Sequence, residues 1–122
     1  MPRPQAPPIR LRRDLLTPWL LLLVRLEPTH GYDLHECLRA LGFPAATSSV
    51  YRGLRQMEAD GLVRSEWRPS NEGADQRVYR LTPKGRRSLK NSVLAFANAR
   101  DSFALFVKQY ELATNRAPKP RR

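Results

Sequence analysis

Residues 46–57, which read Ala-Thr-Ser-Ser-Val-Tyr-Arg-Gly-Leu-Arg-Gln-Met, decide the fold of this chain. Three apolar residues recur there at spacings of four and three, the period of one helix face: Val50, Leu54 and Met57. The opposite face carries small hydroxyl and guanidinium groups: Ser48, Arg52 and Arg55. The stretch predicts a helix that is capped in the region 46–48, ends at Asp60-Gly61, and buries one face while it presents the other.

Two further helices are expected before this stretch. Thr17-Pro18 is typical of an N-cap followed by proline at the first helical position, and the apolar run Trp19–Leu26 continues until Pro28. Thr29 is then expected to cap an amphipathic helix that ends at Gly42. Its apolar face is expected to consist of Leu34, Leu38 and Leu41. Together with residues 46–57, this second helix forms a helix-turn-helix pair.

The segment after Gly61 loses the helical period and gains β-branched and aromatic residues, which favour strands. Residues 62–68 and 77–82 therefore predict a β-hairpin. The polar stretch 69–76 between them is too long for a two-residue turn, so we expect a mobile tip. The hairpin carries four arginines: Arg64, Arg68, Arg77 and Arg80.

A long amphipathic helix is expected from Pro83 to about Ala113. Its apolar positions are spaced by four, three, seven, four and three: Leu89, Val93, Phe96, Phe103, Val107 and Tyr110. A helix of about 30 residues is roughly 45 Å long, more than a small three-helix body covers. We therefore expect these six residues to form the dimer interface with a second copy of the chain.

The expected fold class is mainly α with a small β-hairpin, in the order of a winged helix-turn-helix followed by a long C-terminal dimerisation helix. In this architecture the second helix of the pair enters the DNA major groove. Five motifs support it in order: His30-Gly31-Tyr32-Asp33-Leu34, Val50-Tyr51-Arg52-Gly53-Leu54-Arg55, Asp60-Gly61-Leu62-Val63, Glu66-Trp67 and Tyr79-Arg80-Leu81-Thr82-Pro83-Lys84-Gly85. Together they resemble the PadR-like family of bacterial transcriptional regulators over about residues 18–90.

The resemblance implies a cytoplasmic homodimer, held by its C-terminal helices, that mostly represses transcription and leaves its operator when a small molecule or stress signal arrives. A single C-terminal helix is similar to the smaller subclass, and residues 15–67 also resemble a branch that responds to polyhydroxybutyrate. The chain departs from the family at Ser48, where glycine is frequent, and at Gly53, where alanine is usual. The family's operator preferences therefore do not transfer directly.

The candidate DNA-binding residues lie on the third helix and on the hairpin: Ser48, Ser49, Tyr51, Arg52, Arg55, Arg68 and Arg77. A guanidinium can bridge O6 and N7 of guanine or hold a phosphate. The two serines could contact phosphates or cap the helix, and the tyrosine could reach a phosphate or pack at the core edge. The hairpin arginines are expected to flank the tip, where a wing approaches the minor groove or backbone, or to be ordinary surface residues.

Candidate effector-binding residues are Trp19, Phe96 and Phe103, which would line an apolar space at the dimer interface or else simply pack in the core. No metal or cofactor is expected. His35 and Cys37 point about 200° apart on a helix, and Cys37 is expected to be a buried small residue. The chain lacks a glycine-rich phosphate loop, a nucleophile elbow and a His-Glu-x-x-His motif, so an enzyme is not expected.

Composition and charge divide the chain into four segments. The 122 residues carry a net charge of +11, and residues 1–13 and 114–122 each contribute +4, which leaves +3 for the rest. We expect a basic disordered arm (1–13), a winged-helix DNA-binding domain (14–83), the dimerisation helix (84–113) and a basic disordered tail (114–122). The tails either solubilise the protein or contact phosphates, and a non-specific basic nucleic-acid-binding protein is the alternative function.

Membrane insertion and export are not expected. The longest apolar run, Trp19–Val24, has six residues, whereas a bilayer span needs roughly 20. The N-terminal residues also lack the pattern of a signal peptide. The expected partners are a double-stranded DNA operator, a second copy of the chain and a small apolar or aromatic effector, all in the cytoplasm.

Overall fold

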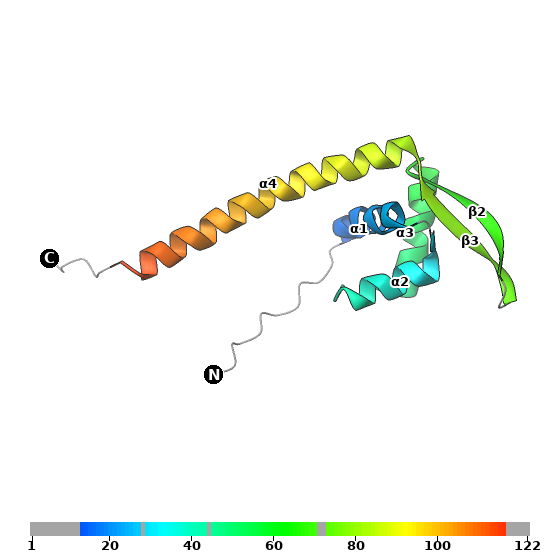
Figure 1. The fold of residues 1–122 in the computed structure, drawn as a ribbon, viewed down its shortest axis with the longest axis horizontal. Helices are drawn as coiled ribbons and strands as arrows, with labels where there is room; N and C mark the ends of the chain where they lie inside the picture. The colour runs from blue at the N-terminus through cyan, green and yellow to red at the C-terminus, as the bar shows by residue number, and fades with distance from the viewer. Residues whose placement is uncertain (1–12, 28, 44, 71–72, 117–122) are drawn as a thin grey trace. The chain divides into compact units, whose positions relative to one another are not determined.

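The computed structural model describes residues 13–27, 29–43, 45–70 and 73–116 (Figure 1). The elements follow in the order α1 (Arg13–Leu26), β1 (Thr29–His30), α2 (Gly31–Ala40), α3 (Thr47–Ala59), β2 (Val63–Ser70), β3 (Gly73–Leu81) and α4 (Pro83–Thr114). Contacts divide the chain into two compact units after Leu89. The first unit is a winged helix, as expected, whereas most of the two predicted basic tails lies outside the described residues.

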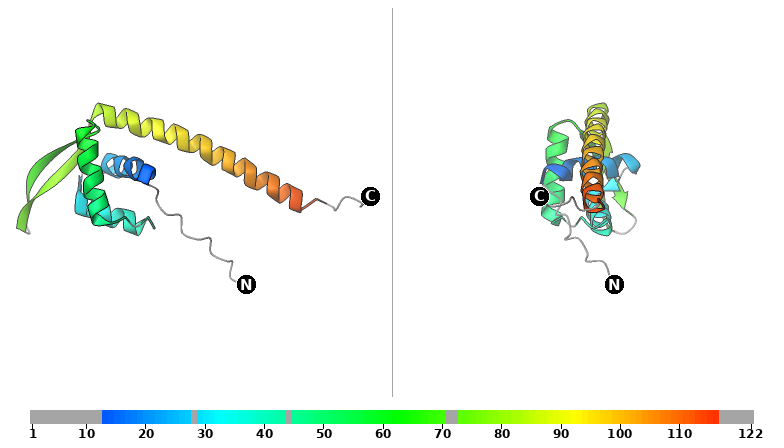
Figure 2. Two further views of the ribbon diagram at one scale, coloured as in Figure 1. Left: turned by 180° about the vertical axis from the view of Figure 1, so that it is seen from behind. Right: turned by 90° about the vertical axis from the view of Figure 1, so that its left-hand side faces the viewer.

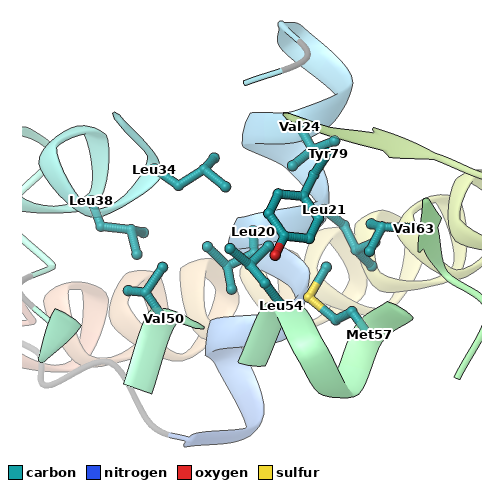
Figure 3. Close-up of a cluster of buried hydrophobic side chains, with 10 residues drawn as sticks. All are labelled: Leu20, Leu21, Val24, Leu34, Leu38, Val50, Leu54, Met57, Val63 and Tyr79. Carbon is teal, nitrogen blue, oxygen red and sulfur yellow. The ribbon is translucent and has the colours of Figure 1, made fainter. Parts of the chain in front are cut away.

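A hydrophobic core joins the three short helices to the base of the sheet (Figure 3). Its fully or almost fully buried side chains are Leu20, Leu21, Val24, Leu34, Leu38, Val50, Leu54, Met57, Val63 and Tyr79. Burying an aliphatic side chain of this size contributes about 1.5–3 kcal/mol, so this cluster holds α3 in place. The predicted apolar face of α3 is confirmed.

The predicted apolar face of α2 is confirmed only in part. Leu34 and Leu38 are buried, but Leu41 is 49% exposed because α2 ends at Ala40 and Leu41 lies in the following turn. Cys37 was expected to be buried and is exposed. It precedes Leu38 by one residue, which rotates it by about 100° from the buried face.

The start of α1 differs from the sequence-based expectation. The helix already includes Arg13, so Thr17 is not its N-cap and Pro18 lies inside it. Pro18 is the sixth residue of the helix and has no N–H to donate to the carbonyl four residues earlier, so one helical hydrogen bond is missing there. Leu16, in the turn before this proline, packs against the core and helps to stabilise the turn.

The sheet has three antiparallel strands in the order β1-β3-β2, where two were predicted. Thr29 pairs with Tyr79 and His30 with Val78, so the prediction that Thr29 caps α2 is wrong. The short strand β1 covers part of the edge that β3 would otherwise expose with unpaired backbone groups. Figure 2 shows α3, in green, between the α1–α2 pair and the β2–β3 ribbon.

The β2–β3 ribbon, here called the wing, is longer than predicted. Its strands pair from Val63 opposite Leu81 to Ser70 opposite Gly73, so the expected long loop over 69–76 is wrong. Only residues 71–72 connect the strands, and they lie outside the described residues. Polar residues near the end of the wing still form strands, because strand pairing uses backbone N–H and C=O groups and does not require apolar side chains. The register shifts between Arg68 and Ser70, where Pro69 lacks a backbone donor.

The first turn of α4 is anchored to the winged helix. The Gly85 N–H donates to Thr82 Oγ1 at 3.0 Å, and this hydroxyl donates to the Gly61 carbonyl. A Cβ on Gly85 would overlap the Leu62 carbonyl oxygen, so only glycine fits. The helix begins at Pro83 as predicted. No helix among the described residues is long and apolar enough to span a membrane.

Candidate nucleic-acid interface

The exposed face of α3 carries the predicted DNA-reading groups. Ser48, Arg52 and Arg55 are all exposed, opposite the three fully buried apolar residues of the same helix. Ala46 occupies the N-cap position with an extended backbone (φ −61°, ψ 141°), so neither Ser48 nor Ser49 is the cap. A row of hydroxyl and guanidinium groups on a rigid helix is chemically suited to phosphates and to base edges.

The side chain of Tyr51 is partly packed and partly exposed. Its ring lies across Gly31 at the start of α2, where an added Cβ would come within 2.5 Å of the ring. The residue is nevertheless 38% exposed. The two interpretations left open by the sequence are therefore compatible: the ring packs at the core edge, and Tyr51 still faces solvent next to Arg52.

A polar cluster on the inner side of the wing ties it to α3. The Ser65 hydroxyl lies 2.7 and 2.9 Å from the two carboxylate oxygens of Glu58, and Arg77 Nη2 donates to Glu58 Oε2 at 3.2 Å. Arg77 Nε also donates to Ser65 Oγ at 2.6 Å. The Arg77 guanidinium carbon lies 5.7 Å from the centre of the Trp67 ring. We call Glu58, Ser65 and Arg77 the wing bridge, because they connect both strands to the helix.

The outer side of the wing carries a separate ionic cluster. Glu66 Oε1 accepts hydrogen bonds from Arg68 Nη2 at 2.9 Å and from Arg80 Nε at 3.4 Å. The hydrogen bond from Arg68, followed by its charge, lowers the pKa of the Glu66 carboxyl below its usual value, and Arg80 adds to the effect. Arg68 and Arg77 therefore lie on opposite sides of the wing and away from the connection between the strands.

A groove of about 410 Å³ lies between the wing, α3 and the start of α2. Its lining residues are Gly31, Tyr32, Tyr51, Arg55, Trp67, Asp75, Gln76, Arg77 and Tyr79. Trp67 is 66% exposed and Tyr32 is 58% exposed. Tyr79 lies at the floor, where burial raises the pKa of its hydroxyl while the charge of Arg77 opposes that shift.

The structure thus brings Tyr51, Arg55 and Arg77 to one groove, with Ser48, Ser49 and Arg52 on the same helix, and leaves Arg68 on the outer side of the wing. All seven remain predicted DNA contacts. Six of the lining residues were not predicted as site residues: Gly31, Tyr32, Trp67, Asp75, Gln76 and Tyr79. Alternation from the buried Val63 through Ser65 places Trp67 on the side of the wing that faces the core, which is the available sequence signal.

The residues expected at a dimer interface lie on the exposed part of α4, except for Leu89, which packs against the core of the winged helix. Five are from 44% to 69% exposed: Val93, Phe96, Phe103, Val107 and Tyr110. Phe106, which is 74% exposed and lies three residues after Phe103, was not among the predicted interface residues. The ring of Trp19, an expected effector residue, lies 5.0 Å from the ring of Phe43, measured between their centres.

Comparison with known proteins gives concordant matches. Residues 20–91 match the family described as the Transcriptional regulator PadR-like family. Transcriptional regulator Rv3488 of Mycobacterium tuberculosis is 42% identical over 60 residues, which cover 49% of this chain and 55% of that protein. The match thus spans little more than half of this relative's length.

Solved structures extend the similarity to the whole fold. A PadR family transcriptional regulator from Eggerthella lenta is 30% identical with a TM-score of 0.69, over 80% of this chain and 85% of that one. The protein smu.1704 of Streptococcus mutans has a TM-score of 0.76 over 92% of this chain and 98% of its own. At 18% identity it shows the fold alone.

Proposed function

The chain belongs to the PadR-like family of transcriptional regulators, and from this premise we propose that it is a homodimeric repressor that binds a specific DNA operator and leaves it when a small molecule binds. The observation that carries the proposal is the exposed face of α3, where Ser48, Arg52 and Arg55 lie opposite a fully buried apolar face. A rigid helix with this distribution can enter the major groove without disturbing the core.

Each side chain on this face has a distinct proposed role. Arg52 provides base-edge contacts, because a guanidinium can donate two parallel hydrogen bonds to guanine. Arg55, which lines the groove beside the wing, holds a phosphate. Ser48, Ser49 and Tyr51 contact phosphates and fix the register of the helix on the duplex. Arg68 and Arg77 act from the wing, where the paired positions of both guanidiniums favour a supporting role over base readout.

Dimerisation through α4 sets the distance between two recognition helices. Phe96, Phe103 and Tyr110 are related by heptad spacing. Val93 and Val107 lie at the complementary position, three residues before Phe96 and Tyr110, a pattern that favours pairing of two helices. A dimer that reads one face of B-DNA requires half-sites about 34 Å apart, or a multiple of that distance. Bound over a promoter in the cytoplasm, such a dimer excludes polymerase.

Release of the operator requires an effector that binds one dimer arrangement better than another. The exposed aromatic residues Phe96 and Phe103, with Trp19, are the proposed lining of an effector site, and an apolar or aromatic compound is the ligand class that suits them. A response to polyhydroxybutyrate remains a prediction from the branch resemblance alone.

Fluorescence anisotropy with DNA from upstream of the protein's own gene tests this function. We expect affinity at least ~10³-fold above that for a shuffled copy, and loss of this preference when Arg52 and Arg55 are both replaced by alanine. Equal, salt-sensitive binding to both DNAs would contradict the proposal and support a non-specific nucleic-acid-binding protein. Circular dichroism of the double variant serves as the folding control.

A further inference from the structure

We propose that the groove between α3 and the wing holds one sugar–phosphate strand of the DNA, with a phosphate at Arg55 and a deoxyribose packed on the ring of Trp67. The proposal deepens the function given above and rests on it. It assigns sequence-independent contacts to Trp67 and Tyr32, and it gives Arg77 the role of a positioning residue.

Arg77 is already engaged in contacts within the protein. Its guanidinium donates to Glu58 and Ser65 and lies over the ring of Trp67, so its hydrogen bonds serve to hold the wing and the indole in place. A side chain already paired in this way gives up existing hydrogen bonds if it turns to a phosphate. Arg77 therefore acts on DNA through the position of Trp67.

Trp67 exposes most of its side chain on the wall of the groove. An indole that is 66% exposed on the wall of a groove leaves apolar area in water, and covering that area is favourable. Tyr32, at the start of α2, also lines the groove and is more than half exposed. Exposed aromatic rings in a groove fit a partly apolar strand, and deoxyribose is the apolar part of the DNA backbone.

Charged residues of both signs line the groove. Arg55 on α3 and the N-terminal end of α2 at Gly31 both line the groove and provide positive potential there. Asp75 is the acidic residue among the described groove residues and lies on the wing. A phosphate therefore binds beside α2 and α3, and the next sugar along the strand reaches Trp67. This charge complementarity favours a nucleic-acid backbone over a neutral ligand.

The fluorescence of Trp67 provides a direct test in a folded protein. The chain has two tryptophans, so a Trp19→Phe variant reports Trp67 alone, and the matched Trp67→Phe variant reports Trp19 alone. On addition of operator DNA, we expect the emission of Trp67 to change and its quenching by acrylamide to fall, whereas Trp19 stays unchanged. Acrylamide quenching of Trp67 that is unaffected by saturating operator would overturn the proposal.

Affinity measurements provide the second test. Trp67→Ala is expected to weaken binding of operator and of shuffled DNA by the same factor, about 5- to 10-fold, with an unchanged salt slope, because no charge is lost. Arg55→Ala is expected to reduce the salt slope by about 0.9. Asp75→Asn is expected to strengthen binding to both DNAs. A Trp67→Ala variant that binds the operator as tightly as the wild type would overturn the proposal.

The two proposals fail in different ways. If the wild type shows no preference for its operator, the function proposed above is wrong. If it prefers the operator while Trp67 remains accessible to acrylamide in the complex, the function stands and the groove assignment is wrong.

Discussion

Replacing Glu58 by glutamine should loosen the wing while the core stays intact. The carboxylate lies 2.7 and 2.9 Å from the Ser65 hydroxyl and 3.2 Å from Arg77 Nη2, and it is the member of the wing bridge that comes from α3. The Arg77 and Glu58 side chains are 42% and 30% exposed. The contribution of the wing bridge to the free energy of unfolding therefore lies between two typical values. An exposed ion pair contributes about 0.2–1 kcal/mol, and a sheltered charge-assisted hydrogen bond contributes about 1.5–3 kcal/mol.

Glutamine keeps the shape and one oxygen acceptor but loses the charge. We therefore expect a decrease of about 1 kcal/mol in the free energy of unfolding, or roughly 4–8 °C in melting temperature for a domain of this size. Hydrogen exchange should also become faster in β2 and β3, because the strands lose their connection to α3.

Glu66→Gln is the matched control. It removes the same charge from the wing, but its partners Arg68 and Arg80 lie in the sheet and no contact to α3 is lost. Thermal unfolding followed by circular dichroism compares the stability of the two variants. Their operator affinities can also be compared directly, because both variants have the same net charge. The reasoning is refuted if Glu58→Gln and Glu66→Gln give equal melting temperatures and equal amide exchange.

Three further predictions use the same purified protein. Gly53→Ala should stabilise the protein by up to about 1 kcal/mol, since the new methyl group meets side chains no closer than 3.4 Å. Gly85→Ala should destabilise it, because a backbone carbonyl occupies the site of the new methyl group. The two melting temperatures should therefore shift in opposite directions, and shifts of the same sign would contradict the prediction. Phe103→Asp should raise the dissociation constant of the dimer measured by sedimentation, and Asn98→Asp, on another face of α4, should not. Equal dissociation constants for the two variants would contradict the assignment of Phe103 to the dimer interface. Burial raises the folded-state pKa of Tyr79 above its usual value, so its contribution is complete below about pH 10 and is lost as the pH rises further. Tyr79→Phe should therefore reduce the alkaline loss of stability, and identical pH profiles would contradict this.

Local periodicity explains which parts of the fold the sequence predicts well. The buried face of α3 and the extent of α4 follow from apolar spacings of three and four within one segment. By contrast, β1 forms because Thr29 pairs with Tyr79, fifty residues later in the chain. A two-residue strand has no period of its own, so the sequence offers a helix cap as an equally good interpretation of Thr29.

The candidate site divides in the same way. Arg52 and Arg55 are predictable because their face of α3 is set by the helix alone. The role of Arg77 depends on its register opposite Trp67 and on the approach of Glu58, which comes from an element nineteen residues away. Long-range register and helix packing therefore decide which wing residues face the groove, and composition identifies only that the wing is basic.

Selection of bound sequences from a randomised duplex library tests whether the protein reads a specific operator, because it makes no assumption about the operator sequence. We expect enrichment of an inverted repeat whose half-sites lie about one helical turn apart, or a multiple of it, and loss of this motif when Arg52 and Arg55 are replaced by alanine. Recovery of no common motif by the wild-type protein, with binding that depends only on salt, would contradict this expectation.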